Sequence, residues 1–233
     1  MRNAVKAFWQ LGAGLALLAA MIAEWSWVQR TTFHTGVSVG LIVGGILLVY
    51  PAAALARRAL ERAPGPERGP WVTLALHVVL LVLLGNAIVE AAKTGTAWPG
   101  PALPFPRRGS LVLLWVTGVA AVLSVVNLAI IGLGAPFAPI LSQRLATSWL
   151  YRWTRNPMGL GTLAFLAALG LWFQSLLFVA WALLLVTPAW LYFVVVYEER
   201  ELEMRFGDSY REYRARTPLI IPGRRRAPGG GRR

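Results

Sequence analysis

The sequence predicts an all-α fold, namely a polytopic membrane helix bundle of about six transmembrane helices with a C-terminal cytoplasmic helical segment. Composition is the first observation, because 57% of the 233 residues are hydrophobic and only 14% are charged, whereas an ordinary globular domain carries about 25% charged residues. The mean hydropathy of +0.57 is the second observation. The third is a series of apolar runs that approach the roughly 20 residues a helix needs to cross a bilayer.

Six apolar runs are the predicted transmembrane helices. They cover residues 8–28, 35–56, 71–91, 110–133, 158–173 and 176–197. The first run lacks a small-residue cleavage site and is followed by further spans, so we interpret it as a retained helix and not as a signal peptide. Pro64-Gly65-Pro66 and Pro99-Gly100-Pro101 break the chain after the second and third runs. Only Gln174 and Ser175 join the last two runs, which predicts an antiparallel hairpin whose short fifth helix tilts or stops before the far headgroups.

The basic residues predict both the orientation of the chain and its partners. A formal net charge of +13 would indicate nucleic acid in a soluble protein. Here the charge lies between apolar runs and at the C-terminus, so we expect membrane lipids and no nucleic acid as partners. Of the 23 Lys and Arg residues, only Arg30, Lys93, Arg107 and Arg108 lie on one predicted side of the membrane. Cytoplasmic loops carry the Lys and Arg excess, so we expect a cell-membrane protein with both termini cytoplasmic.

The chain contains no cysteine and only two histidines, His34 and His77. Disulfides, thiol catalysis and cysteine metal sites are therefore excluded, and no metal site is expected because the two imidazoles are far apart in sequence. His77 lies inside an apolar run and is predicted to be a packed or lumen-facing polar residue. Asn86, Glu90 and Asn127 also lie within spans, and we expect them to hydrogen-bond to each other or to neighbouring helices.

The segment 151–161 places an anion-binding pattern at the start of the fifth predicted helix. Asn156 can accept hydrogen bonds from the free amides of a helix start, and Pro157 fits the first helical position. Arg155 lies beside those free backbone donors, which predicts a site for a carboxylate or a similar group. Gly159 and Gly161 allow a ligand or another helix to approach closely.

The segment 198–213 carries paired carboxylates after the sixth predicted helix. Glu198 and Glu199 are expected to end that helix, where they can accept hydrogen bonds from ribose hydroxyls or an ammonium group. A further helix should then end at Gly207. Asp208 should cap a short helix that carries two tyrosines on one face.

Together the two segments would form a lidded site for a small zwitterionic ligand, because the charge count puts Arg155 and Glu198 on one side of the membrane. Ionisable residues at such a boundary are a functional-site hypothesis by default. Spacing alone leaves a structural alternative open. In that alternative Arg155 is a membrane anchor, Asn156-Pro157 is only a helix cap, and Glu201 pairs with Arg205 on a solvated helix.

Residues 132–222 resemble the isoprenylcysteine carboxyl methyltransferase and phospholipid methyltransferase superfamily of integral membrane enzymes. Its members show Tyr-Arg-x-x-Arg-(His/Asn)-Pro-x-Tyr-x-Gly before a helical hairpin and Glu-Glu-x-x-Leu-x-x-x-Phe-Gly-x-x-Tyr-x-x-Tyr after it. The matching residues of this chain are Tyr151, Arg152, Arg155, Asn156, Pro157, Gly161, Glu198, Glu199, Leu202, Phe206, Gly207, Tyr210 and Tyr213. The chain departs from the pattern at two positions, because Gly159 stands in place of a tyrosine and Trp149 in place of a glycine.

The resemblance implies a methyltransferase that uses S-adenosylmethionine as cofactor. It also implies a lipid or small hydrophobic molecule as methyl acceptor, which would enter from the bilayer. The residues that the resemblance assigns to cofactor binding are Tyr151, Arg155, Asn156, Pro157, Gly161, Glu198, Glu199, Tyr210 and Tyr213, with Arg155 and Glu198 also at the catalytic centre. Gly159 should remove an aromatic wall of the cofactor pocket, and Trp149 should change the turn.

The acceptor is expected to be nucleophilic already, as a carboxylate or thiolate is, or to be an amine deprotonated by Glu or water. The reason is that neither histidine nor cysteine is expected to be available near the motifs. Three other classes are alternatives: a non-catalytic membrane scaffold that retains the fold, an NADPH oxidoreductase resembling steroid reductases, and a transporter. No extra basic cluster for a 2′-phosphate stands beside the motifs, and no matched pair of broken helices occurs in two halves, so the last two are disfavoured.

The sequence predicts three regions. Residues 1–109 form an N-terminal transmembrane region, and residues 110–222 form a methyltransferase-like membrane core with a cytoplasmic cofactor site. Residues 223–233 form a basic tail, which is expected to be disordered because its arginines, glycines and proline cannot bury a core.

Overall fold

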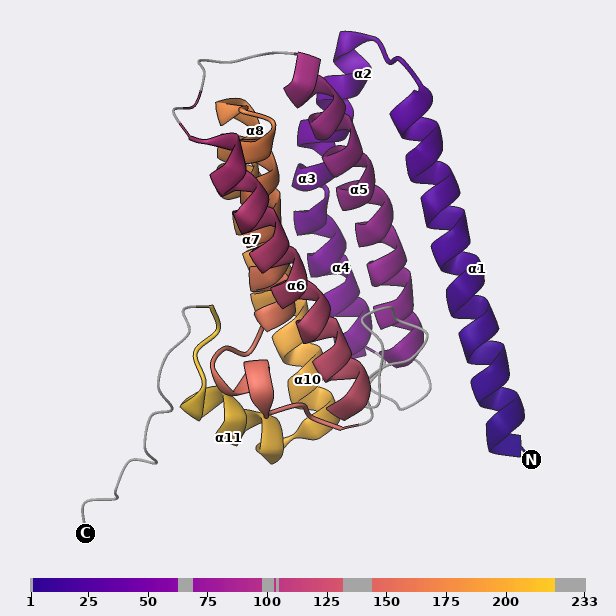
Figure 1. The fold of residues 1–233 in the computed structure, drawn as a ribbon. Coiled ribbons are helices and arrows are strands. Elements are labelled where there is room, and N and C mark those ends of the chain that lie inside the picture. The colour runs from indigo at the N-terminus through magenta and orange to yellow at the C-terminus, as the bar shows by residue number, and fades with distance from the viewer. Residues whose placement is uncertain (1, 63–68, 98–102, 104, 132–143, 221–233) are drawn as a thin grey trace.

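The computed structural model describes residues 2–62, 69–97, 103, 105–131 and 144–220, and every regular element within these ranges is a helix. The long helices stand side by side as one elongated bundle (Figure 1). In chain order the elements are α1 (Arg2–Arg30), α2 (Thr35–Val39), η1 (Gly40–Gly44), α3 (Gly45–Leu47), α4 (Val49–Arg62), α5 (Gly69–Ala97), α6 (Arg107–Ile131), η2 (Trp149–Arg152), α7 (Pro157–Trp172), α8 (Leu176–Trp181), η3 (Ala182–Val186), α9 (Thr187–Phe193), η4 (Val194–Glu198), α10 (Glu199–Phe206) and α11 (Asp208–Arg216). The predicted all-α class is confirmed.

The six predicted apolar runs are helical over nearly all of their described residues, with Leu48 and Phe173 in turns. Within the described residues, four helices are long and apolar enough to cross a membrane by length and composition, namely Thr35–Arg62, Gly69–Gly95, Arg107–Leu128 and Leu176–Phe206. The two other predicted spans correspond to α1 and to α7, whose 16 residues form a shorter apolar helix. The number of six crossings therefore stays a prediction.

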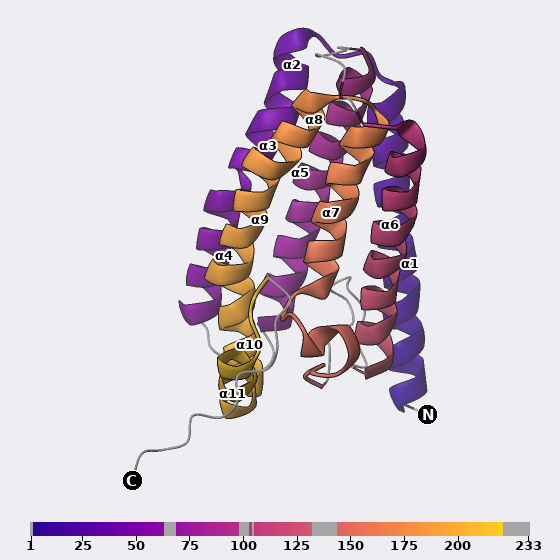
Figure 2. The same cartoon turned by 60° about the vertical axis from the view of Figure 1, so that its left-hand side comes forward.

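The predicted antiparallel hairpin is formed by α7 and the helix that begins with α8 (Figure 2). Its turn is tight because Gln174 adopts a φ of +56° and Ser175 Oγ accepts a hydrogen bond from the amide of Phe178 at 3.2 Å. On its other side α7 approaches α6 closely at Gly161, where an added Cβ would lie 3.1 Å from the backbone of Ala121. These contacts position the first turn of α7.

The last long helix runs without interruption from Leu176 to Phe206, so the prediction that Glu198 and Glu199 end it is wrong. Two five-residue π-helical segments, η3 and η4, lie within it. Asn156 and Arg155, on the loop before α7, contact Glu198 and Glu199 respectively. The helix can therefore continue past both carboxylates without leaving either of them without a partner. The helix ends at Gly207 as predicted, with a φ of +55° in the region that glycine favours. The expected Asp208 cap is also wrong, because Asp208 accepts a hydrogen bond from Arg211 at 2.6 Å and does not cap α11.

One hydrophobic core lies between α4, α5 and the last long helix. It includes Ile46, Val49, Ala53, Leu76, Leu80, Ala87, Phe178, Val186, Phe193 and Tyr197. Helices from both sides of the predicted boundary at residue 109 therefore contribute to the same core. The predicted tail 223–233 lies outside the described residues.

The two ends of the bundle carry different elements. The beginning of α1 lies at the same end as α10 and α11, whereas α2 lies at the opposite end (Figure 1). The prediction that the end with α10 and α11 faces the cytoplasm stays a prediction.

Candidate functional site

The loop before α7 is tied to the chain that follows α11. Thr154 Oγ1 donates a hydrogen bond to the carbonyl of Leu219 at 2.7 Å. The amide of Arg155 donates to the carbonyl of Pro218 at 2.9 Å. The two segments singled out in the sequence are therefore held together at one end of the bundle.

Asn156 and Pro157 start α7 as predicted. Asn156 Oδ1 accepts a hydrogen bond from the amide of Gly159 at 3.0 Å, and Pro157 lies in the first turn. The same side chain donates from Nδ2 to Glu198 Oε2 at 3.1 Å. Because Asn156 is buried, it links the start of α7 to the last long helix in addition to capping α7.

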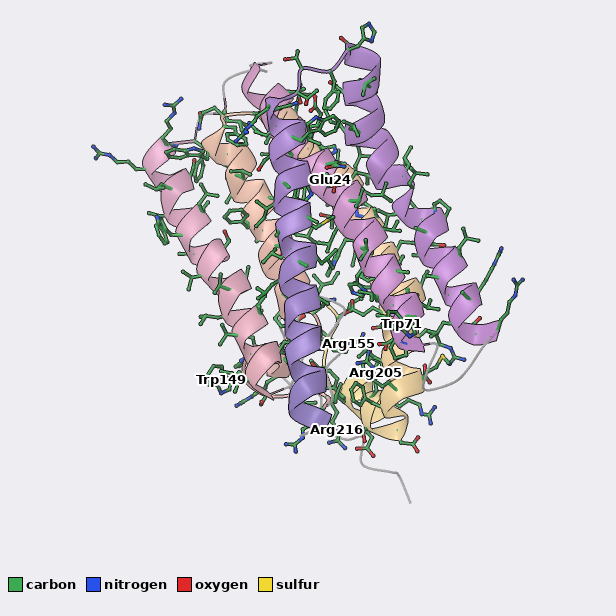
Figure 3. All side chains as sticks on the ribbon, turned by 90° about the vertical axis from the view of Figure 1, so that its right-hand side faces the viewer. Glu24, Trp71, Trp149, Arg155, Arg205 and Arg216 are labelled. Atoms are coloured by element: carbon green, nitrogen blue, oxygen red, sulfur yellow. The ribbon has the colours of Figure 1, made fainter. Side chains whose placement is uncertain are left out.

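Arg155 is the centre of a charged cluster at this end of the bundle (Figure 3). Its Nη1 forms an ion pair with Glu199 Oε1 and lies 3.5 Å from the hydroxyl of Tyr210. The side chains of Arg155 and Glu199 are only 12% and 7% exposed, and Arg214 lies 3.5 Å from the second oxygen of Glu199.

The Nε atom of Arg155 is buried and has no hydrogen-bond partner among the described residues. A buried donor without a partner costs about 1–3 kcal/mol. The cluster therefore holds an unused donor that an incoming acceptor group can satisfy.

Three tyrosines surround this cluster. Tyr213 donates its hydroxyl proton to the carbonyl of Tyr151 at 2.6 Å, and its ring lies 6.3 Å from that of Tyr210. Burial raises the pKa of Tyr151 and of Tyr210. The carboxylate of Glu198 raises the pKa of Tyr151 further, and those of Glu199 and Glu198 raise the pKa of Tyr210 further. The phenols of Tyr151 and Tyr210 therefore stay protonated near neutral pH and can donate a hydrogen bond to a ligand.

A cavity of about 120 Å³ lies beside the cluster. Six of the nine residues that the resemblance assigned to cofactor binding line it, namely Tyr151, Arg155, Asn156, Glu198, Tyr210 and Tyr213. The other three contribute differently. Pro157 starts α7, Gly161 packs against α6, and Glu199 contacts the cavity wall through Arg155.

Part of the cavity wall was missed by the sequence analysis, because it comes from α5 and from other faces of the last long helix. Thr73 and His77 come from α5, while Tyr197, Glu201 and Arg205 come from the last long helix.

Glu201 and Arg205 form the ion pair that the structural alternative predicted. The expectation that no histidine lies near the motifs is wrong, since α5 packs beside the last long helix. The sequence did contain a sign of this polar face of α5. Thr73 and His77 are four positions apart in an apolar run, and residues at that spacing lie on one helix face.

The two departures from the superfamily pattern have visible structural consequences. Gly159 faces α9, where an added Cβ would overlap the ring of Trp190. The space that a side chain at Gly159 would enter is therefore filled from α9, and Gly159 does not line the described cavity wall. Trp149 adopts a φ of +53°, in the left-handed region that glycine favours. The turn is thus retained, although a bulky residue in this region costs about 1–3 kcal/mol.

Comparisons with known proteins show similarity to methyltransferases. Residues 109–209 match the family model described as phospholipid methyltransferase. Methanethiol S-methyltransferase 1 of Bradyrhizobium diazoefficiens is 40% identical over 83 residues, which cover 35% of this chain and 27% of that protein. Methanethiol S-methyltransferase of Mycobacterium tuberculosis is 26% identical over 217 residues, which cover 84% of each chain. Methanethiol S-methyltransferase 2 of Bradyrhizobium diazoefficiens is 36% identical over 84 residues, which cover 36% of this chain and 30% of that protein.

This chain thus spans less than a third of the two Bradyrhizobium proteins and most of the mycobacterial one. No solved structure matches it significantly. The resemblance to the isoprenylcysteine carboxyl methyltransferase and phospholipid methyltransferase superfamily is confirmed. The relatives that this chain resembles are named as methyltransferases, and four of its described helices are apolar and long enough to cross a membrane.

Proposed function

We propose that this protein is an S-adenosylmethionine-dependent methyltransferase of the membrane whose acceptor is a small lipophilic thiol. The family match and the names of the relatives support the methyltransferase class. The observation that carries the proposal is the buried Nε of Arg155. It is a donor without a partner among the described residues, and it lies at a helix start beside the carboxylates of Glu198 and Glu199.

The residues around the cavity fit the chemistry of the cofactor. S-adenosylmethionine carries a carboxylate, an ammonium group, ribose hydroxyls and a sulfonium. Arg155 and the free amides in the first turn of α7 would bind the carboxylate. Glu198 and Glu199 would accept hydrogen bonds from the ammonium group or the ribose hydroxyls. The complete set proposed for cofactor binding is Tyr151, Arg155, Asn156, Pro157, Gly161, Glu198, Glu199, Tyr210 and Tyr213, with Arg155 and Glu198 also proposed as catalytic.

Binding requires side chains to move, because a cavity of about 120 Å³ is smaller than the roughly 300–1,000 Å³ of a typical ligand pocket. The ion pair between Arg155 and Glu199 joins the loop before α7 to α10. We propose that the cavity enlarges when this ion pair rearranges, since Arg155 must change its contacts to bind a carboxylate.

The chain contributes mainly by positioning. When bound, the cofactor supplies an electrophilic methyl group on its sulfonium sulfur. Arg155 would hold one end of the cofactor, and the hydrogen bond from Asn156 orients the carboxylate of Glu198. The buried wall excludes water from the two reactants, and alignment of the reactants is a large source of rate enhancement.

The apolar part of the cavity wall favours a small acceptor. It consists of Leu128, Leu145, Ala146, Met158 and Leu202. A small wall of this kind suits a low-molecular-weight thiol better than a phospholipid headgroup, and the names of the relatives point the same way. The superfamily resemblance also allows a lipid acceptor, so the experiment must compare a lipid with a small thiol.

The test is calorimetry on detergent-purified protein with S-adenosylmethionine and NADPH side by side, followed by methyl transfer to methanethiol and to phospholipid vesicles. We expect binding of S-adenosylmethionine alone and transfer to the thiol. Binding of NADPH without S-adenosylmethionine would favour the oxidoreductase alternative, and binding of neither would favour the scaffold. Transfer to lipid alone would contradict the proposed acceptor.

A further inference from the structure

His77 is the histidine that lines the cavity of the candidate site within the described residues. It comes from α5, which lies outside the segment that matches the family model. Resting on the proposed function, we infer that His77 is a catalytic base and that its Nε2 takes the proton of the thiol acceptor.

The hydrogen bond of His77 defines which ring nitrogen is available. Nδ1 lies 2.7 Å from the carbonyl oxygen of Thr73, and a carbonyl oxygen can only accept a hydrogen bond. Nδ1 therefore carries the proton, and the neutral ring has its lone pair on Nε2. Nε2 has no hydrogen-bond partner in the part of the chain that the structure describes. This lone pair is therefore available to a molecule in the cavity.

The surroundings of His77 hold the ring in place. Thr73 Oγ1 donates its proton to the carbonyl of Gly69 at 3.0 Å, so it must accept the hydroxyl proton of Tyr197, which lies 2.8 Å away. The ring of Phe193 meets the imidazole edge-on, with centroids 5.8 Å apart and 88° between the planes. A base held in one orientation is what proton transfer in a catalytic site needs.

The other proton acceptors in the cavity wall are already engaged by side chains. Glu198 accepts a hydrogen bond from Asn156, and Glu201 is paired with Arg205. Both carboxylates are held by these contacts, whereas Nε2 of His77 is not held by any that the described residues show. His77 is thus the better placed base for a neutral acceptor.

A thiol needs such a base because the thiolate is the nucleophile and an ordinary thiol pKa of about 8.5 lies above neutral pH. In the proposed step the S–H bond breaks, the proton passes to Nε2, and the acceptor sulfur keeps the electron pair. That pair forms the new bond to the methyl carbon, and the pair of the broken carbon–sulfur bond stays on the departing sulfur. The imidazolium then releases the proton to water. The acceptor therefore does not have to arrive already ionised, in contrast to the expectation from the sequence.

The first test is the variant His77→Asn, because the side-chain amide of asparagine can still donate to the Thr73 carbonyl while the base is lost. We expect methyl transfer to methanethiol to fall by about 10²–10⁴-fold, the usual contribution of a general base, with unchanged S-adenosylmethionine affinity by calorimetry. Thiophenol, which is largely ionised at neutral pH, should be methylated at similar rates by both proteins. His34→Asn is the matched control, since asparagine can retain the helix cap that His34 provides to α2.

A second readout does not depend on turnover. In His34→Asn protein, His77 is the only imidazole, so nitrogen-15 histidine NMR reports its two ring nitrogens alone. With S-adenosylhomocysteine present, which has no methyl group to transfer, methanethiol should shift the Nε2 signal. Dimethyl sulfide, which has no S–H proton, should not shift it.

Two kinds of result would overturn the assignment of His77. One is wild-type turnover, or lost cofactor affinity, in His77→Asn. The other is an Nε2 signal that responds equally to methanethiol and dimethyl sulfide, or to neither, in protein that binds S-adenosylmethionine. If the wild-type protein fails to bind S-adenosylmethionine at all, the proposed function fails as well, and calorimetry identifies that case before His77 is tested.

Discussion

Two buried ionic clusters lie toward opposite ends of the helix bundle, and they differ in what their charges contact. In the first, called the Lys93 cluster, Glu90 is 2% exposed, accepts a hydrogen bond from Ser38 at 2.7 Å and pairs with Lys93 at 2.5 Å. Lys93 Nζ also donates to the carbonyls of Val28 and Thr31, each at 2.8 Å. These contacts join α1, α2 and α5, so this cluster connects helices as the sequence predicted for Glu90.

The second, called the Arg155 cluster, consists of Arg155, Asn156, Glu198 and Glu199. It also joins segments that are distant in sequence, but it borders a cavity and contains the unused donor of Arg155. The two clusters show that buried charge does not by itself mark a functional site. The cavity that the Arg155 cluster borders is the feature that separates them.

The largest expected effect is on the stability of the Lys93 cluster. Lys93→Met leaves Glu90 buried without its counter-charge, and loss of one partner of a buried pair costs about 3–5 kcal/mol. Thermal unfolding in detergent should therefore show a much lower midpoint, while the folded protein should bind S-adenosylmethionine as before. Arg57→Ala is the control, because its ion pair with Glu61 is exposed and such pairs contribute about 0–1 kcal/mol. Equal stability of the two variants would show that the Lys93 cluster does not hold the helices together.

The next effect is on ligand binding at the Arg155 cluster. Charge-assisted hydrogen bonds contribute about 1.5–3 kcal/mol, so Arg155→Ala or Glu198→Ala should weaken S-adenosylmethionine binding by roughly 10- to 150-fold in calorimetry. Arg108→Ala removes an exposed charge elsewhere and should leave the affinity nearly unchanged. Wild-type affinity in the Arg155 and Glu198 variants, with folding confirmed, would remove the distinction between the two clusters and support the scaffold alternative.

A smaller effect should separate two helical glycines that differ in the space around them. Gly159→Ala brings a Cβ into the ring of Trp190 and within 2.8 Å of Asn156 Oδ1, and such overpacking costs about 1–3 kcal/mol. Gly44→Ala meets nothing within 4 Å and should be neutral or stabilise the helix by about 0.5–1 kcal/mol. The unfolding midpoint should fall in Gly159→Ala and stay the same or rise in Gly44→Ala. A Gly159→Ala protein with the wild-type midpoint would mean that Trp190 moves away at little cost.

The smallest effect concerns the strained turn beside the Arg155 cluster. Trp149 is 63% exposed and has a φ of +53°, so Trp149→Gly relieves the backbone strain whereas Trp149→Ala does not. Both variants lose the same exposed ring, and the glycine variant should therefore be more stable than the alanine variant by about 1 kcal/mol. Denaturant or thermal unfolding measures the difference. A more stable alanine variant would indicate that the turn is not strained in solution.

The sequence by itself determined the elements that depend on local interactions. Apolar runs predicted the helices, Asn156 and Pro157 predicted the start of α7, and the two-residue connection at Gln174 and Ser175 predicted the hairpin. The hairpin in turn predicted that the segments around Arg155 and Glu198 meet, because two antiparallel neighbours return the chain to the end from which it started.

Only the tertiary structure decided which side chains complete the site. His77 enters the cavity wall from α5, Trp190 fills the space beside Gly159, and the last long helix continues past Glu198 because Asn156 and Arg155 provide partners for the carboxylates. Each of these features depends on which helices are neighbours and on how far each helix is rotated about its own axis. Packing of the shared core between α4, α5 and the last long helix sets both quantities, and no short stretch of sequence contains that information.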